Sequence, residues 1–242
     1  MHAIQTNSLV KRYKKLTAVD DLCLCIEQGE LFSLLGVNGA GKTTTIKMLT
    51  CLTQPTDGEA LVGGYSVIKQ PAQVKQLIGV SPQETAVAPN LTVKENLAFI
   101  CGIHGFDRQK TAQRIHDLCG QFGLDEVLTQ KARTLSGGWQ RRVSIAMALI
   151  SEPKILFLDE PTLGLDVIAR HDLWQTIRAM KGKVTIILTT HYMEEAEALS
   201  DRIGLMKNGR LLAVGTADEL KRCAGCDDFE SAFVALIKEA NT

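Results

Sequence analysis

A glycine-rich segment between an apolar run and a helical pattern constrains the fold of this chain more than any other feature. The segment GVNGAGKT, Gly36 to Thr43, fits the pattern GxxxxGK[ST], with the apolar run ELFSLLG before it and KTTTIKMLTCL after it. Its glycines let backbone N–H groups wrap a polyphosphate, and the positive end of the following helix adds to the attraction. We expect Lys42 to reach the β- and γ-phosphates and the Thr43 hydroxyl to bind Mg²⁺.

Apolar strands and helical patterns alternate along the chain, which predicts a mostly parallel sheet flanked by helices. The predicted strands lie at 30–36, 155–160 and 184–190, and the predicted helices at 42–52, 166–180 and 193–199. Turn residues fill QPTDGE at 54–59, and Asn208-Gly209 between RIGLMK and RLLAV predicts a hairpin. Helical patterns dominate between Thr85 and Leu149, which we interpret as an inserted helical lobe. The tail from Thr216 also has a helical pattern.

Length and charge narrow the classes of protein. The 242 residues suit one large α/β domain, and 27 Lys plus Arg balance 27 Asp plus Glu. This balance lacks the basic excess typical of nucleic-acid binders. The longest apolar runs fall short of the roughly 20 residues that span a bilayer, and the N-terminus has no apolar segment of a secretory signal. We therefore expect a protein of the cytosol.

The seven cysteines do not form the pattern of a disulfide-rich secreted domain, so we expect reduced thiols. Cys223 and Cys226 have CxxC spacing without a second pair of ligands, so ordinary surface thiols are the favoured interpretation. Cys23 and Cys25 alternate with apolar residues at the period of a strand, and we expect them to be small packing residues.

Acidic residues and a histidine follow two of the predicted strands. ILFLDE ends in Asp159 and Glu160, and His191 follows VTIILTT. The carboxyl ends of strands in a doubly wound sheet form the ligand crevice, so Asp159 is suited to hold Mg²⁺. Glu160 is placed to polarise an attacking water, and His191 to sense the γ-phosphate. Each feature alone has a structural alternative, and their convergence on one cleft favours the catalytic interpretation.

LSGGWQ precedes the helical pattern QRRVSIAMALI and predicts a second helix N-terminus suited to an anion. Ser136, Gly137 and Gly138 lie at this N-terminus. The alternative is a serine cap followed by flexible glycines.

Together these segments resemble the ATP-binding subunits of ABC (ATP-binding cassette) transporters. GVNGAGKTT is similar to the Walker A motif, ILFLDE to Walker B and LSGGWQ to the signature motif. Gln83 in GVSPQE resembles the Q-loop, Gly164-Leu165-Asp166 the D-loop, His191 the switch histidine and Tyr13 the aromatic residue that stacks on adenine. The resemblance covers about Ile4 to Leu220. Trp139, Cys51 and Val167 depart from the commonest family pattern, and none of them removes a ligand or the base.

The resemblance implies an α/β fold: a P-loop NTPase (RecA-like) core with a mixed, mainly parallel sheet, an N-terminal antiparallel β subdomain and an inserted α-helical lobe. It implies one domain over 1–242. The core and β subdomain would occupy 1–84 and 150–215, the helical signature lobe 85–149 and a helical tail 216–242.

The resemblance also implies roles for individual residues. ATP hydrolysis would use Glu160, His191 and Gln83, and Mg²⁺ would be held by Thr43, Gln83 and Asp159. ATP would be bound by Tyr13, Gly36, Val37, Asn38, Gly39, Ala40, Gly41, Lys42, Thr43 and Thr44. In a head-to-tail dimer with a second copy or a homologous subunit, the partner's ATP would be contacted by Ser136, Gly137, Gly138, Gln140 and Asp166.

The implied function is ATP hydrolysis that drives export through a separate transmembrane permease. The permease would dock at the helical lobe near Gln83 and hold the chain at the cytoplasmic face of the cell membrane. NLTVKENLAFICGIHG and TTHYMEEAEALSDRI resemble the exporter branch, which serves drugs, antibiotics, surface polysaccharides, lipids or ions. The transported substrate contacts the permease in this architecture, so this chain carries no sequence signal for it.

Two alternatives have weaker support. A soluble ABC ATPase acting on ribosomes or DNA would carry two cassettes or a long coiled-coil insertion before the signature, and this sequence has neither. A regulator that binds ATP without hydrolysing it would be expected to lack the base, and Glu160 is present.

Overall fold

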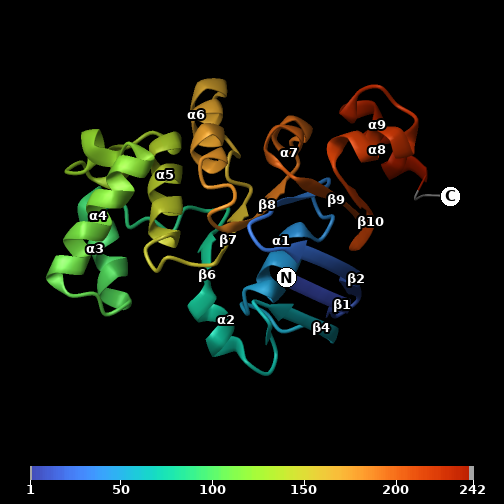
Figure 1. Cartoon of the computed structure of the whole chain (residues 1–242), viewed down its shortest axis with the longest axis horizontal. Coiled ribbons are helices and arrows are strands. Elements are labelled where there is room, and N and C mark those ends of the chain that lie inside the picture. Colours follow the sequence, from blue (N-terminus) through green and yellow to red (C-terminus); the bar gives the residue numbers. More distant parts are fainter. Residues whose placement is uncertain (1, 240–242) are drawn as a thin grey trace.

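The computed structural model describes residues 2–239 and builds two β-sheets with helices around them (Figure 1). The larger sheet has the strand order β10-β9-β3-β8-β7-β6, and the smaller has the order β2-β1-β4-β5. The strands are β1 His2–Tyr13, β2 Leu16–Glu27, β3 Leu31–Leu35, β4 Asp57–Val62, β5 Tyr65–Ser66, β6 Ile78–Ser81, β7 Ile155–Asp159, β8 Thr185–Thr190, β9 Arg202–Lys207 and β10 Arg210–Gly215.

Helices cover the larger sheet and form a lobe beside it. They are α1 Lys42–Leu49, α2 Pro71–Leu77, α3 Val93–Ile103, α4 Arg108–Phe122, α5 Gly137–Ala148, α6 Val167–Arg178, α7 Met193–Leu199, α8 Ala217–Ala224 and α9 Phe229–Glu239, with short 3₁₀ turns at Leu124–Val127 and Ala132–Thr134. The predicted α/β class, with its mainly parallel sheet, antiparallel β subdomain and helical lobe, is confirmed.

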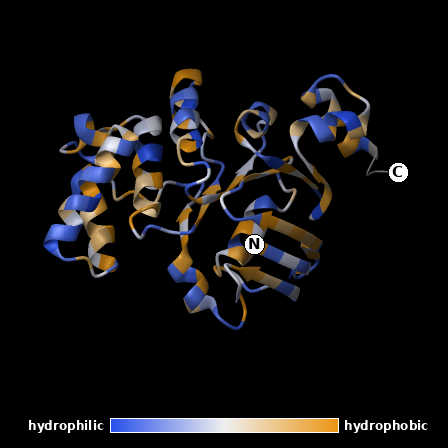
Figure 2. Ribbon diagram, viewed as in Figure 1, coloured by the Kyte–Doolittle hydropathy of each residue, from blue (hydrophilic) through white to orange (hydrophobic). Residues whose placement is uncertain are grey.

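The middle of the larger sheet is buried on both faces. Every residue of β3, β7 and β8 is buried, as expected for parallel strands covered by helices. Figure 2 shows these strands as mostly hydrophobic. In their parallel register Leu35 pairs with Thr190, and Asp159 pairs with Thr189. The residues that follow β3, β7 and β8 therefore meet at one edge of the sheet.

The smaller sheet corrects one expectation. In β2 the side chains alternate between core and solvent, with Leu22, Leu24 and Ile26 buried. Cys23 and Cys25 lie on the opposite face and are exposed. The prediction that these cysteines pack inside was wrong. Alternate residues of a strand lie on opposite faces, and here the leucines and the isoleucine take the buried face, which leaves the cysteines on the solvent face.

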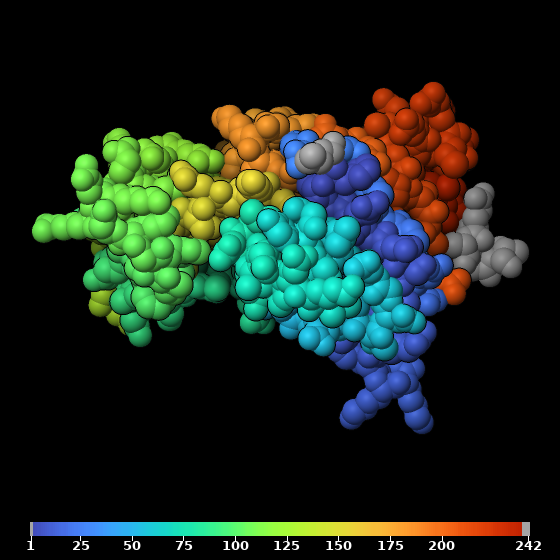
Figure 3. Space-filling model, turned by 60° about the horizontal axis from the view of Figure 1, so that its bottom comes forward, coloured from blue at the N-terminus to red at the C-terminus, as the bar shows by residue number. Residues whose placement is uncertain are grey.

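The helical lobe has its own packing around α3, α4 and α5 and projects from one side of the body (Figure 3). Its core includes Leu97, Leu118, Phe122 and Val143, which belong to a cluster that continues under β7 and β8. The first turn of α3 is a capping box: Thr92 accepts from the Glu95 N–H, and the Glu95 carboxylate accepts from the Thr92 N–H. The lobe therefore has a defined start and an apolar attachment to the core.

The C-terminal segment packs at the β10 edge of the larger sheet, at the opposite end from the helical lobe (Figure 1). The β9–β10 hairpin turns at Asn208 and Gly209, whose φ angles are 49° and 82°, as the predicted Asn-Gly turn requires. Helices α8 and α9 place Leu220, Phe229 and Phe233 against the sheet. The predicted helical tail extends to residue 242, and 240–242 lie outside the described residues.

Candidate active site

The loop at 36–41 joins β3 to α1 and leaves the first turn of the helix open to a ligand. Gly41 caps α1 with φ 104° and no side-chain cap bond, so the first N–H groups lack intrahelical partners. A Cβ at Gly41 would lie 2.5 Å from the Ala18 carbonyl oxygen, so the position requires glycine. The local geometry is that of an anion-binding helix N-terminus.

This loop opens into a cleft of about 770 Å³. The cleft is lined by residues 16–18 and 38–44, and by Gln83, Glu160, Leu163, His191 and Asn208. The structure thus brings together residues from the ends of β3, β6, β7 and β8. In the first part of this loop, the carbonyl oxygens of Gly36 and Val37 accept hydrogen bonds from Lys42 Nζ at 2.7 and 3.4 Å.

Tyr13 lies outside this lining. It ends β1, is 43% exposed, and its ring centroid is 5.0 Å from Lys11 Nζ. The described residues that line the cleft on this side are 16–18, at the start of β2. Stacking of Tyr13 on adenine therefore stays a prediction.

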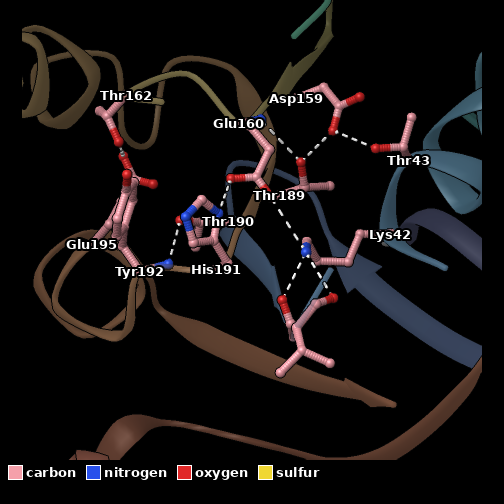
Figure 4. A network of polar contacts seen from close by, with 12 residues as sticks. Lys42, Thr43, Asp159, Glu160, Thr162, Thr189, Thr190, His191, Tyr192 and Glu195 are labelled. Atoms are coloured by element: carbon pink, nitrogen blue, oxygen red, sulfur yellow. Dashed lines mark hydrogen bonds and ion pairs between the residues drawn. The ribbon is translucent and has the colours of Figure 1, made fainter. Parts of the chain in front are cut away.

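Two side chains contact the Glu160 carboxylate at the floor of the cleft (Figure 4). Lys42 Nζ lies 3.2 Å from its Oε1, and His191 Nδ1 lies 2.8 Å from its Oε2. The Glu160 and Lys42 side chains are 7% and 6% exposed. A buried carboxylate between a lysine and a histidine is suited to accept a proton from a water in the cleft.

Asp159, the residue before Glu160, points to the start of α1. Its Oδ1 accepts a hydrogen bond from Thr43 Oγ1 at 3.1 Å, and a second one from Thr189 Oγ1. Gln83 lines the same cleft. Hydroxyl, carboxylate and amide oxygens are hard donors that suit Mg²⁺, which takes the rest of its shell from water and phosphate oxygens. This donor set fits the predicted ion.

Gln83 is positioned by an arginine that sequence reasoning missed. Arg141 donates to the carbonyl oxygens of Pro82 at 2.7 Å and Gln83 at 2.6 Å. Its side chain is buried, and burial lowers its pKa while Asp159 and Glu195 oppose that shift. Arg141 thus joins α5 to the end of β6. An arginine early in an amphipathic helix gives no sequence signal of such a contact.

The LSGGWQ segment lies at the start of α5, where Ser136 is the N-cap residue but makes no side-chain cap bond. The alternative of a plain serine cap is therefore wrong. Gln140 Nε2 donates to the Leu135 carbonyl oxygen at 3.1 Å, and Asp166 caps α6 by accepting from the Ala169 N–H at 2.9 Å. Ser136, Gly138 and Asp166 line a second hollow of about 370 Å³. None of them lines the Lys42 cleft in this chain.

Comparison with known proteins gives the family. A family model described as ABC transporter matches residues 19–163. The linearmycin resistance ATP-binding protein LnrL of Bacillus subtilis is 40% identical over 98% of this chain and 76% of its own length. The daunorubicin/doxorubicin resistance ATP-binding protein DrrA of Streptomyces peucetius is 41% identical over 92% of this chain and 68% of its own length. Other relatives are longer, and the chain spans 13% of the human phospholipid-transporting ATPase ABCA3.

Solved structures agree. A structure titled as the ATP-binding subunit of an ABC transporter has a TM-score of 0.86 at 29% identity, covering 97% of this chain and 99% of the other. A dimeric post-hydrolysis state of the ATP-binding cassette MJ0796, bound to ADP and Pi, has a TM-score of 0.79 at 26% identity, covering 88% and 98%. The chain therefore belongs to the ABC transporter family, as an ATP-binding subunit with ATP hydrolase activity.

Proposed function

We propose that the cleft at Lys42 binds Mg-ATP and that hydrolysis there drives export through a separate membrane permease. The observation that carries this proposal is the contact of Glu160 with both Lys42 and His191 at the mouth of the phosphate-binding loop. The loop residues 36–44 would bind the phosphates, and Tyr13 the base. Thr43, Asp159 and Gln83 would hold Mg²⁺, which supplies charge neutralisation of the phosphate oxygens.

Each side chain then has a defined task in hydrolysis. The Glu160 carboxylate accepts the proton of the attacking water, because its position beside the phosphate-binding loop puts it next to the γ-phosphate. Lys42 neutralises charge on the β- and γ-phosphates, and it lies on the other oxygen of the same carboxylate. His191 contacts the second carboxylate oxygen and also lines the cleft, so it connects the base to the γ-phosphate.

We also propose a head-to-tail dimer with composite sites. The hollow at Ser136 and Asp166 is separate from the Lys42 cleft within one chain. A second copy or a homologous subunit would bring Ser136, Gly137, Gly138, Gln140 and Asp166 onto the nucleotide of its neighbour. The dimeric MJ0796 structure supports this arrangement. A γ-phosphate held between two helix N-termini bonds the halves, and its loss separates them.

The permease contact is proposed for the outer face of the helical lobe beside Gln83. Phe99 and Ile103 on α3 are 60% and 64% exposed. Next to them a hollow of about 240 Å³ lies between Pro82, Ile100 and α5. No helix within residues 2–239 is long and apolar enough to cross a membrane. A peripheral position at the cytoplasmic face of the cell membrane, held by the permease, follows from this proposal.

The substrates are proposed from the relatives. The names of LnrL and DrrA attach those proteins to resistance against linearmycin and against daunorubicin and doxorubicin. We propose that this chain likewise serves an exporter of drug-like compounds, with no nucleic acid as a partner.

Cysteine cross-linking tests the composite site. In a background lacking the native cysteines, Asn38→Cys and Ser136→Cys should join two chains only when ATP and Mg²⁺ are present. Gln109→Cys, at the exposed start of α4, replaces Ser136→Cys in the control pair and should stay uncoupled. Bonds that form only within one chain, or equally with both pairs, contradict the proposal.

Copurification tests the permease contact. Phe99→Glu should reduce recovery of the membrane subunit from a detergent extract while leaving ATP binding intact. Val234→Glu on α9 is the matched control, because Val234 is also exposed, at 40%, but lies on the opposite side of the molecule. Equal recovery of the membrane subunit with both variants argues against docking at α3.

A further inference from the structure

Glu195 on α7 is a fully buried carboxyl group that the roles described so far do not use. Its exposure is 0%. Oε1 accepts hydrogen bonds from Thr162 Oγ1 at 2.8 Å and from Trp174 Nε1 at 3.0 Å. Oε2 is buried and has no hydrogen-bond partner among residues 2–239. Burying a carboxyl group costs free energy unless its oxygens are hydrogen-bonded and its charge is paired or neutralised.

The three residues of this contact come from segments that flank the catalytic groups. Thr162 lies just after Glu160, in the segment that leads to Asp166. Trp174 lies on α6, which Asp166 caps. Glu195 lies on α7, which begins directly after His191 and Tyr192. Figure 4 shows Thr162 and Glu195 close together, to the left of Glu160 and His191.

We propose that Glu195 is a positioning residue for ATP hydrolysis, which ties the segment after Glu160 to the segment after His191 and so maintains their 2.8 Å contact. Both hydrogen bonds converge on one oxygen, so the carboxyl fixes α6, α7 and the Thr162 turn relative to one another. Loss of this tie would leave each catalytic group present but free to move apart. A displacement of about 1 Å in a catalytic group can lower a rate on the order of a hundredfold.

The surroundings of Glu195 disfavour a charge on its carboxyl group. Burial raises the pKa of Glu195, and the neighbouring Glu160 adds to the increase, while Thr190, Thr162 and Trp174 oppose it. Arg141 on α5 also interacts electrostatically with Glu195, and His191 lies before α7 beside Glu160. Arg170 on α6 and Glu194 on α7 pair with each other instead, with Glu194 on the solvent side. Burial and the Glu160 carboxylate both act against a second negative charge at Glu195, while Oε1 accepts from both donors.

The neighbouring residue offers a matched control. Glu194 is on the same helix, but its side chain is 77% exposed and pairs with Arg170 at 3.6 Å. Glu194→Gln therefore changes the same chemistry on the solvent side of α7 and should leave hydrolysis unchanged. Glu195→Gln keeps the acceptor oxygen and a neutral group, whereas Glu195→Leu removes the acceptor and leaves Thr162 and Trp174 without it.

Steady-state ATP hydrolysis by the full chain separates these cases. The proposal rests on the ATP hydrolase activity of the chain. We expect Glu195→Leu to lower kcat at least about tenfold with KM for ATP changed less than about twofold, the signature of a defect realised after binding. Glu195→Gln should recover the wild-type kcat at neutral pH. As pH rises, the wild type should lose activity relative to Glu195→Gln, because only the wild type has a carboxyl group at this position, and its raised pKa shifts its ionisation to higher pH.

The outcomes decide the proposal. The proposal is overturned if Glu195→Leu keeps the wild-type kcat. It is also overturned if Glu195→Gln loses as much activity as Glu195→Leu, or if the ratio of kcat between wild type and Glu195→Gln stays constant across pH. If Glu195→Leu does not fold, Thr162→Val combined with Trp174→Phe removes both donors and should lower kcat in the same way; unchanged kcat there also overturns it. A wild-type chain that binds ATP but does not hydrolyse it contradicts the hydrolase assignment instead.

Discussion

At the scale of single residues, Glu160 combines an unusual backbone conformation with a fully engaged side chain. Its φ is 48°, in the left-handed region that residues other than glycine seldom adopt. Its N–H donates both to the Thr189 carbonyl oxygen at 3.1 Å and to Thr189 Oγ1 at 3.0 Å. Such strain persists where the surrounding structure holds it, as is common at catalytic sites. Thr189 therefore aims both Glu160 and Asp159.

Glu160→Gln should abolish turnover and preserve ATP binding. The amide keeps the shape of the side chain and its contact with Lys42, but it cannot accept the proton of the attacking water. ATP and Mg²⁺ should then trap a dimer, which gel filtration detects. A monomer that still hydrolyses ATP contradicts the role of Glu160 as base.

Thr189→Val should lower kcat by about tenfold or more, because it removes the hydroxyl that contacts both Asp159 and the Glu160 N–H. Valine matches threonine in volume, so β8 should stay intact. Thr185→Val is the control: it lies on the same strand, and its hydroxyl accepts from the Gly29 N–H away from the cleft. The rate of ATP hydrolysis, measured over a series of Mg²⁺ concentrations, compares the two variants with wild type. Equal effects of the two substitutions argue for a general effect on the strand.

Sequence reasoning reached the residues that local motifs carry and missed those that depend on packing between segments. Lys42, Asp159 and Glu160 were predictable because each follows or opens a recognisable strand or helix. Arg141 and Glu195 were not, because their contacts join segments distant in sequence. Thr189 gave no distinct signal, because Thr185 and Thr190 are polar residues of the same strand.

At the scale of elements, ends are set by local conformations that a pattern does not show. The helix predicted over 42–52 ends at Leu49, because Cys51 takes φ 58°, a conformation that favours glycine after a helix. The turn predicted over 54–59 gives way to β4 at Asp57, because its residues pair with β1. The pattern of apolar residues predicted some of the elements, and backbone conformation and pairing decided where they begin and end.

Thr92→Ala should destabilise the protein by about 1 kcal/mol, the usual cost of losing an N-cap threonine. The same substitution at Thr216 is the matched comparison, since Thr216 and Glu219 form an identical capping box at α8. Hydrogen exchange should show loss of protection at α3 in the first variant and at α8 in the second. Loss spread over the whole chain in either variant contradicts a local cap effect.

At the scale of the whole molecule, three hydrophobic clusters share the larger sheet and hold its layers together. One joins the helical lobe to one face of the sheet, a second fills the space between the two sheets, and the third covers β9 and β10 with α8 and α9. The catalytic residues lie where these layers meet, so ionisable groups buried there influence the stability of the entire fold.

The free energy of unfolding should fall as pH rises through the raised pKa of Glu195. A carboxyl whose folded pKa lies above its ordinary value of 4.5 contributes stability in full below that value, and the contribution is lost as the folded group ionises. Burial also raises the pKa values of Cys101 and Cys119, which are buried, and of Cys51, which is partly buried; these thiols act in the same direction at more alkaline pH.

Urea denaturation of wild type and Glu195→Gln over a series of pH values isolates the Glu195 contribution. The variant should show a smaller decline on the alkaline side, because the cysteines are common to both proteins. Parallel declines contradict a raised pKa at Glu195.

The position of β3 between β8 and β9 affects when the sheet can form during synthesis on the ribosome. Strand β3 emerges early, yet both of its neighbours are made near the other end of the chain, and the Gly29 contact with Thr185 closes a separation of 156 residues. Until then its backbone donors and acceptors have no sheet to join, and the nucleotide cleft does not exist. Strand pairing over such large sequence separations is slow, and until it happens the unpaired strand edges are prone to aggregation. Strand β3 therefore stays without its sheet neighbours during synthesis until β8 and β9 have been made.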